Sequence, residues 1–213
     1  ALCLQGDRKL EKAIPLAEET LRLSKRLLGV DHPDTIRNMG TLARCYNADG
    51  NSELAIQLYE ESLKLRRAKL GPDHPDTITS MEGLAFIYSD AGKLELALPL
   101  YEEALRLSKA KLGADHPKTL ACMYGLANTY LTVGKIQVAL ELSEELLKLS
   151  KAKLGPDHPE TRRDMTNLAN VYSSAMNYEM AIPLYEECLK LAKAIDGPEH
   201  PRTILSMGSL AGG

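Results

Sequence analysis

The sequence has little net charge, no long apolar run and no visible export signal. Its 26 Lys and Arg residues nearly balance 29 Asp and Glu residues, which leaves a net charge of -3. This balance provides no basic surface for nucleic acid or for an anionic membrane. The longest apolar runs fall far short of the roughly 18 residues that span a bilayer, and no signal peptide is visible. We therefore expect no nucleic-acid partner, no membrane partner and a cytoplasmic location.

The four cysteines show no arrangement for metal binding, since no two of them form a Cys-x-x-Cys pair. Cys3 and Cys45 occupy equivalent positions 42 residues apart, and Cys122 and Cys188 stand among apolar or small residues. Buried free thiols in a reducing compartment are therefore favoured over disulfides or zinc ligands.

Catalytic motifs are missing as well. The chain has no nucleophile elbow, P-loop, Gly-x-Gly-x-x-Gly or His-Glu-x-x-His sequence. Pairs such as Glu60-Glu61 suggest acid and base groups, but consecutive helical residues point about 100° apart, so the two carboxylates would not meet. Glu60 instead precedes Lys64 by four residues, which favours an ion pair on a solvated helix face. We expect that the protein is not an enzyme and that it has no catalytic residue, no metal and no cofactor.

What the sequence does contain is a repeat. Close copies of the segment Leu-Gly-Pro-Asp-His-Pro-Asp-Thr at 70–77 recur with their histidines at positions 32, 74, 116, 158 and 200, a constant step of 42 residues. The step predicts one array of stacked units over residues 1–213 instead of separate domains. The expected units are a partial repeat at 1–30, full repeats at 31–72, 73–114, 115–156 and 157–198, and a partial repeat at 199–213. Because Ala1 falls inside an expected helix, we expect the array to be part of a longer protein.

Each full unit is expected to hold two helices. In the first unit, apolar residues at steps of three and four predict a helix over 34–48, and a second helix over 52–69 follows a polar break. In the link, Gly71 suits the end of one helix, Pro75 suits the start of the next, and Asp73 or His74 suits the cap between them. Equivalent histidines of stacked units would lie at least about 8 to 10 Å apart, too far to share a metal ion. A turn or capping role is therefore favoured for all five histidines.

Superposition of the units separates repeated positions, which we expect to form the core, from varied ones. The repeated pattern Leu-Ala-x-x-Tyr in the first helix, followed by Ala and Leu-Tyr in the second, resembles the tetratricopeptide repeat. The period of 42 residues and the Leu-Gly-x-Asp-His-Pro link resemble the kinesin light chain type, which also occurs in bacterial multidomain signalling proteins. HEAT repeats of similar length lack this link, and WD40 repeats need strands.

The resemblance implies an all-α fold, a right-handed α-α superhelix of antiparallel helix pairs whose concave wall is formed by the first helix of each unit. It also implies a non-catalytic scaffold that binds a peptide or a partner helix and belongs to a larger signalling protein. The wall positions vary from unit to unit, which fits a binding surface and also fits drift. The expected partner-binding residues are Arg37, Arg44, Asn47, Thr79, Glu82, Phe86, Ser89, Tyr124, Asn128, Leu131, Arg163, Thr166, Asn170 and Ser173.

The chain lacks residues that two known groups of this family use to bind their partners. Gly40, Gly83, Ala121 and Gly125 stand among the positions where some members clamp a partner's C-terminal carboxylate, so chaperone-tail binding is not expected. Of the paired asparagines that precede Leu-Ala in kinesin light chains, only Asn167 is present. Two other functions stay open as alternatives. One is end-to-end self-association through uncapped terminal repeats, and the other is a metal-binding or enzymatic protein that uses the Asp-His-Pro links.

Overall fold

The computed structural model describes residues 7–195 and 197, and within this part it contains nine α-helices and no strand. The all-α fold predicted from the sequence is therefore confirmed there. His200 and the partial repeat predicted at 199–213 lie outside the described residues. The chain divides into two compact units, Ala1–Leu112 and Gly113–Gly213, whereas the repeat boundaries given above stay a prediction. No described helix combines the length and the apolar content that crossing a bilayer requires.

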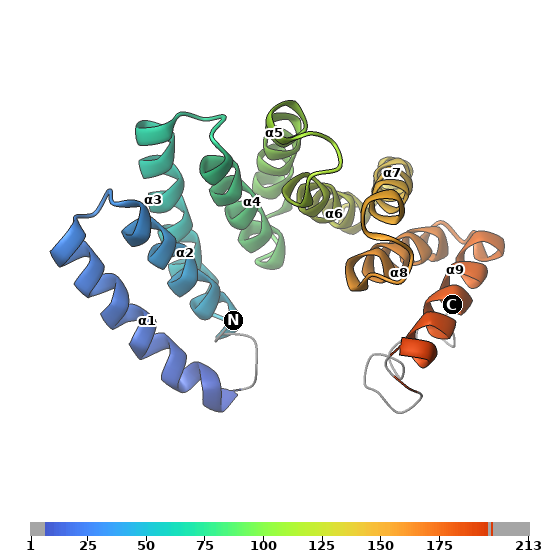
Figure 1. Ribbon diagram of the computed structural model, residues 1–213, viewed down its shortest axis with the longest axis horizontal. Coiled ribbons are helices and arrows are strands. Elements are labelled where there is room, and N and C mark those ends of the chain that lie inside the picture. The colour runs from blue at the N-terminus through green and yellow to red at the C-terminus, as the bar shows by residue number, and fades with distance from the viewer. Residues whose placement is uncertain (1–6, 196, 198–213) are drawn as a thin grey trace. The chain divides into compact units, whose positions relative to one another are not determined.

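The first unit contains five helices in sequence. They are α1 (Asp7–Leu28), α2 (Pro33–Ala48), α3 (Ser52–Leu70), α4 (Pro75–Asp90) and α5 (Leu94–Leu112). Each helix packs against the next one in the chain, and α2 also contacts α4 (Figure 1). The helices that open two consecutive pairs therefore lie next to each other, which brings their side chains onto one surface.

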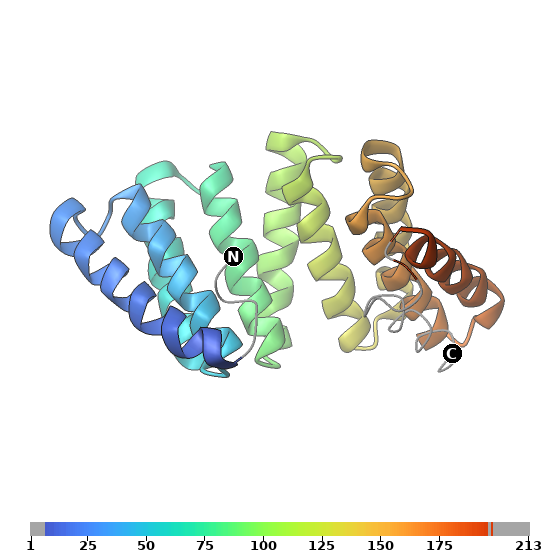
Figure 2. The same ribbon diagram turned by 60° about the horizontal axis from the view of Figure 1, so that its bottom comes forward.

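The second unit repeats this arrangement with four helices. They are α6 (Pro117–Thr132), α7 (Ile136–Leu154), α8 (Pro159–Ser174) and α9 (Tyr178–Ile195). Neighbours in sequence again pack together, and α6 also contacts α8 (Figure 2). The helices α2, α4, α6 and α8 each begin 42 residues after the previous one, so the sequence period is a structural period.

Histidine and proline fix the start of each of these four helices. A proline is the first helical residue, where its missing N–H costs nothing and its fixed φ suits the helix. The preceding histidine accepts at Nδ1 a hydrogen bond from the backbone N–H two residues later, at 3.1 to 3.2 Å. This bond satisfies one of the donors that every helix start leaves unpaired. The capping role is confirmed for His32, His74, His116 and His158.

The repeated apolar positions form the core. Met39, Met81, Met123 and Met165 are fully buried, and so are the alanines four residues after them. Small residues at these sites let neighbouring helices approach closely, and the long methionine side chains fill the remaining space.

Paired glutamates tie successive helices together. The Tyr88 hydroxyl donates to Glu60 Oε1 at 2.5 Å, and Glu61 pairs with Lys25 of α1 at 3.4 Å. Burial and the hydrogen bond to Glu60 raise the pKa of Tyr88 to about 12. The two adjacent carboxylates thus contact different helices, as expected from their divergence. The predicted ion pair of Glu60 with Lys64 is wrong, because Glu60 accepts a hydrogen bond from the Tyr88 hydroxyl instead.

The expectation of free thiols is only partly correct. Cys122 and Cys188 are buried thiols that form no disulfide. Cys45, which is 1% exposed on α2, forms a disulfide. The position of a cysteine within the repeat does not distinguish a disulfide from a free thiol, because a buried half-cystine and a buried thiol occupy the same apolar environment.

Candidate functional site

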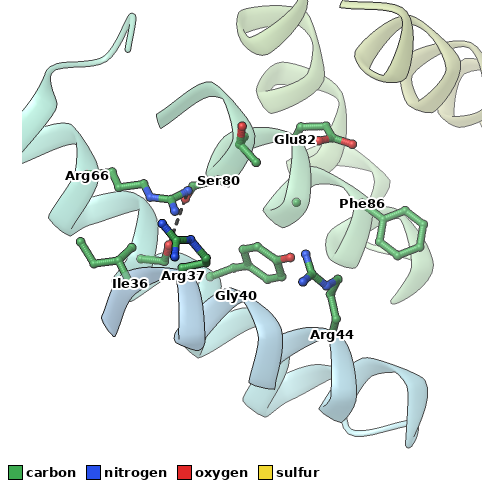
Figure 3. A pocket seen from close by; sticks show the side chains of 12 residues that line it. Ile36, Arg37, Gly40, Arg44, Arg66, Ser80, Glu82 and Phe86 are labelled. Atoms are coloured by element: carbon green, nitrogen blue, oxygen red, sulfur yellow. Dashed lines mark hydrogen bonds between the residues drawn. The ribbon is translucent and has the colours of Figure 1, made fainter. Parts of the chain in front are cut away.

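An open cavity of about 210 Å³ lies between α2, α3 and α4 in the first unit (Figure 3). The first helices of two consecutive pairs supply two of its walls, and α3 lies between them. Its lining comprises Ile36, Arg37, Gly40, Arg44, Tyr59, Ser62, Arg66, Thr79, Ser80, Glu82, Gly83 and Phe86.

Five of the predicted partner-binding residues meet in this cavity. Arg37 and Arg44 come from α2, and Thr79, Glu82 and Phe86 come from α4. Phe86, the sole phenylalanine of the sequence, is 52% exposed. An aromatic ring that remains this exposed at a cavity edge offers apolar surface to a partner.

Two helical glycines make room for the Tyr59 ring, which is 6% exposed. A Cβ atom at Gly83 would lie 2.4 Å from Tyr59 Cε1, so no larger residue fits there without moving the ring. A Cβ atom at Gly40 would lie 3.8 Å from the same Cε1 atom, an ordinary contact distance. Gly83 is therefore needed for packing, whereas Gly40 only leaves space open.

Three arginines line the cavity around Tyr59. Arg37 donates to Asp34 at 2.6 Å, which balances its charge. Arg66 is half-buried, and its Nη1 donates to the Asp76 carbonyl at 2.7 Å and to Ser80 Oγ at 2.9 Å, both neutral acceptors. Burial lowers the pKa of Arg66, the direction expected of a partly desolvated cation.

Burial also raises the pKa of Tyr59; the charge of Arg44 opposes that rise and Glu82 adds to it. Both charges therefore act on the Tyr59 hydroxyl. Arg44 is exposed, and it donates a long hydrogen bond of 3.5 Å to Thr41.

The second helix of the pair supplies three lining residues that the sequence reasoning missed, namely Tyr59, Ser62 and Arg66. Tyr59 and Ser62 are buried on α3, as expected of packed core positions. A signal existed for Arg66, because its equivalents in the other repeats are the small residues Ser24, Ser108, Ser150 and Ala192. One arginine among small residues at equivalent positions indicates a local difference.

The remaining wall residues of the first unit do not reach the cavity. Asn47 donates from Nδ2 to Asp90 Oδ2 at 2.7 Å, which joins the ends of α2 and α4. Ser89 is half-buried near the end of α4.

In the second unit, the wall has one aromatic-cation contact. The Arg163 guanidinium stacks on the Tyr124 ring, 4.1 Å from its centroid, a geometry that stabilises the pair through the ring quadrupole. Arg163 also donates to Asp164 Oδ1 at 3.0 Å from Nη2 and at 3.1 Å from Nε. Burial raises the pKa of Asp164, while hydrogen bonds from Ser150 and Arg163 oppose that rise.

Amide side chains of the second unit are tied to their neighbours. Asn167 Nδ2 donates to Asn128 Oδ1 at 2.6 Å, and Asn167 Oδ1 accepts from Ser143 at 2.9 Å. Asn170 Oδ1 accepts from Tyr185 at 2.6 Å. These bonds orient Asn128 and Asn170 on the wall. Three further predicted residues, Thr166, Leu131 and Ser173, are half-buried on α6 and α8.

The chemistry that this wall can perform is recognition. Arginine and amide groups donate hydrogen bonds, and Phe86 and Tyr124 offer ring surface. Among residues 7–195 and 197, no three His, Cys, Asp or Glu side chains come together as a metal site would require.

Comparisons with known proteins agree with this geometry. The family model described as Tetratricopeptide repeat matches residues 1–68, 46–110, 82–152, 133–193 and 165–212. Among curated proteins, none matches the sequence significantly.

Solved structures with the same fold confirm the predicted solenoid class. This chain is similar to two crystal structures of the nearly identical TPR-like repeats of a putative kinesin light chain from Podosopora anserina. One of them, of a singly substituted form, gives a TM-score of 0.76 and 26% identity over 88% of this chain and 89% of that chain. The other gives 0.73 and 27% over the same shares. BtubC (BKLC) from P. vanneervenii gives a TM-score of 0.80 and 22% identity over 95% of this chain and 82% of that chain, which shows a shared fold.

Proposed function

We propose that this chain, which belongs to the tetratricopeptide repeat family, is a non-catalytic scaffold that holds a peptide or a partner helix against the first helices of its repeats. Repeats of this family generally bind protein partners, because stacked helix pairs leave an extended surface uncovered. The partner-binding residues we assign to that surface are the wall residues predicted from the sequence, with Phe86 and Tyr124 as the aromatic contacts.

One observation carries this proposal. The cavity between α2, α3 and α4 gathers Arg37, Arg44 and a half-exposed Phe86 outside the buried core. Ring surface together with arginine is the composition that dominates binding energy in protein interfaces. A surface formed only by packed core residues would be apolar and would contain no open cavity.

A peptide library displayed on phage and selected on the immobilised chain tests the proposal. Bound peptides are then measured against the variants Phe86→Ala and Tyr124→Ala. Loss of a buried aromatic contact weakens binding about tenfold or more. Gln57→Ala, on the exposed face of α3, is the matched control and leaves binding unchanged. Equal binding by the wild type and both aromatic variants would remove this wall as the binding surface.

We further propose that the array works in the cytoplasm as one part of a larger signalling protein. The buried thiols of Cys122 and Cys188 support a reducing compartment, whereas the disulfide at Cys45 requires an oxidant. Thiol alkylation of the protein in freshly lysed cells decides between the two. A reactive Cys45 after denaturation supports the cytoplasm, and a protected Cys45 contradicts it.

A further inference from the structure

Two arginines of the first-unit cavity, Arg44 and Arg66, have no arginine at the equivalent positions of the other repeats. Arg66 stands where Ser24, Ser108, Ser150 and Ala192 stand in the other repeats. Ser150 is fully buried and donates to Asp164 Oδ2 at 2.6 Å, so a serine suffices to pack this position. The fold therefore does not require the guanidinium of Arg66. A partly desolvated cation costs free energy that packing does not return.

Arg44 shows the same pattern. Its equivalents are Phe86, Asn128 and Asn170, all of which the fold accommodates. Neither Arg44 nor Arg66 has a carboxylate within ion-pair distance in the described part of the chain, whereas Arg37 is paired with Asp34. Figure 3 shows the guanidinium groups of Arg37 and Arg66 next to each other and that of Arg44 pointing inward from α2.

The charges around the cavity leave room for an anion. Its charged lining residues are Arg37, Arg44, Arg66 and Glu82, a net charge of +2. Asp34 offsets Arg37 from outside the cavity, and Asp76 acts on Arg66 at a longer distance. Within the described residues, Arg44 and Arg66 remain without a carboxylate at ion-pair distance, and both charges act on the Tyr59 hydroxyl. Two such cations match one doubly charged group.

A carboxylate carries one negative charge, which one arginine balances, so the charge of the second arginine stays uncompensated. A phosphate monoester carries about -1.5 to -2 charges near neutral pH and has three terminal oxygens, so it can accept from both arginines and from a hydroxyl. Tyr59, which lines the same cavity, can donate that third hydrogen bond.

We propose that the cavity lined by Arg44, Arg66 and Tyr59 binds a phosphorylated serine or threonine side chain of the partner peptide. The proposal rests on the proposed function, since it assumes that a peptide occupies this wall. It makes binding to the first unit dependent on a kinase that modifies the partner. The Asp76 carbonyl and Ser80 orient Arg66, and Phe86 contacts the peptide beside the phosphate.

The test uses three synthetic probes, blocked five-residue alanine peptides with phosphoserine, glutamate or serine at the centre, and inorganic phosphate as a fourth. Each is titrated into the ¹⁵N-labelled chain while the Nε–H resonances of Arg44 and Arg66 are followed by NMR. The phosphoserine peptide is expected to shift both resonances and to bind about tenfold more tightly than the glutamate peptide. Its affinity is expected to rise from pH 5 to pH 7, because the second pKa of the phosphate is about 6, whereas glutamate binding stays constant there.

Substitutions borrowed from the other repeats keep the fold intact. Arg66→Ser and Arg44→Asn place residues that equivalent positions already carry, and each is expected to weaken phosphopeptide binding about tenfold. Arg106→Gln, an exposed arginine of α5, makes a similar change in charge outside the cavity and leaves binding unchanged.

Four outcomes overturn the proposal. They are equal affinity for the glutamate peptide, equal affinity for inorganic phosphate, no shift at Arg44 or Arg66, and equal weakening by Arg106→Gln. The first outcome would assign the site to acidic peptides and leave the proposed function standing. The proposed function itself fails only in the library experiment, when Phe86→Ala and Tyr124→Ala bind as the wild type does.

Discussion

Two alanine substitutions, Gly83→Ala and Gly40→Ala, test how the cavity is built. Both glycines lie inside helices that line it, and alanine in a helix interior is more stable than glycine by about 0.5 to 1 kcal/mol. At Gly40 the new Cβ would meet Tyr59 Cε1 at 3.8 Å, so the full gain is expected. At Gly83 the Cβ would lie 2.4 Å from Cε1 and 2.8 Å from Cζ of the same ring, well inside the optimum of about 3.5 to 4.0 Å.

Overpacking of this kind costs about 1 to 3 kcal/mol. Gly40→Ala is therefore expected to raise the free energy of unfolding by about 1 kcal/mol, and Gly83→Ala to lower it by about 1 kcal/mol. Urea unfolding followed by far-UV circular dichroism measures both, and comparison within one unit cancels deviations from two-state behaviour.

A second pair of variants isolates the clash. In a Tyr59→Leu background the shorter side chain no longer reaches α4, so Gly83→Ala should become stabilising by about 1 kcal/mol. If Gly83→Ala stabilises the wild type as much as Gly40→Ala does, the Tyr59 ring is not in close contact with α4 at Gly83, and the packing described above is refuted.

Three further predictions concern single residues. Met176 has φ of 57° in a turn where the other repeats place glycine. Met176→Gly should therefore raise the free energy of unfolding in urea by about 1 kcal/mol, and Gly134→Ala should lower it by a similar amount. A loss of stability in Met176→Gly or a gain in Gly134→Ala contradicts this. His116→Ala should lower the free energy of unfolding, measured by thermal unfolding, by about 1 kcal/mol through loss of the helix cap, and His116→Asn should restore it. If His116→Asn does not restore the stability, His116 has a role other than capping. Because burial raises the pKa of Asp164, ionising it costs stability at neutral pH and less as pH falls through the folded and then the unfolded pKa. Asp164→Asn should therefore gain more over the wild type in urea at pH 7 than at pH 4, and a larger gain at pH 4 contradicts this.

The helices could be predicted closely because local signals coincide at their ends. The expected helix at 34–48 is α2 (Pro33–Ala48), and that at 52–69 is α3 (Ser52–Leu70). Apolar spacing, a proline at the first position and a histidine cap all mark the same boundary. Agreement among independent local preferences is what makes a helical repeat recognisable in one sequence.

The cavity could be predicted only in part. The positions of Arg37, Arg44 and Phe86 follow from the period and from the resemblance, because equivalent residues share one helix face. Arg66 and Tyr59 could not be placed, since their contacts depend on long-range partners such as Gly83 and Ser80. Periodicity reports which face a residue occupies and gives no information about which neighbour is small enough to leave space.

Hydrogen bonding of the wall amides was equally hidden. Asn47 and Asn128 were both expected to face the partner, yet each contacts a side chain about one repeat away, Asp90 and Asn167. A polar residue at a varied position looks the same in sequence whether it binds a neighbour or a partner.

Photo-crosslinking from position 86 tests the central claim most directly. The chain carrying p-benzoylphenylalanine in place of Phe86 is irradiated with a peptide selected from the display library, and the chain carrying it in place of Gln57 is irradiated in parallel. A partner held against α2 and α4 predicts a covalent adduct from position 86 and none from position 57. Adducts from position 57 alone, or equal adducts from both positions, would contradict the assignment of this wall as the binding surface.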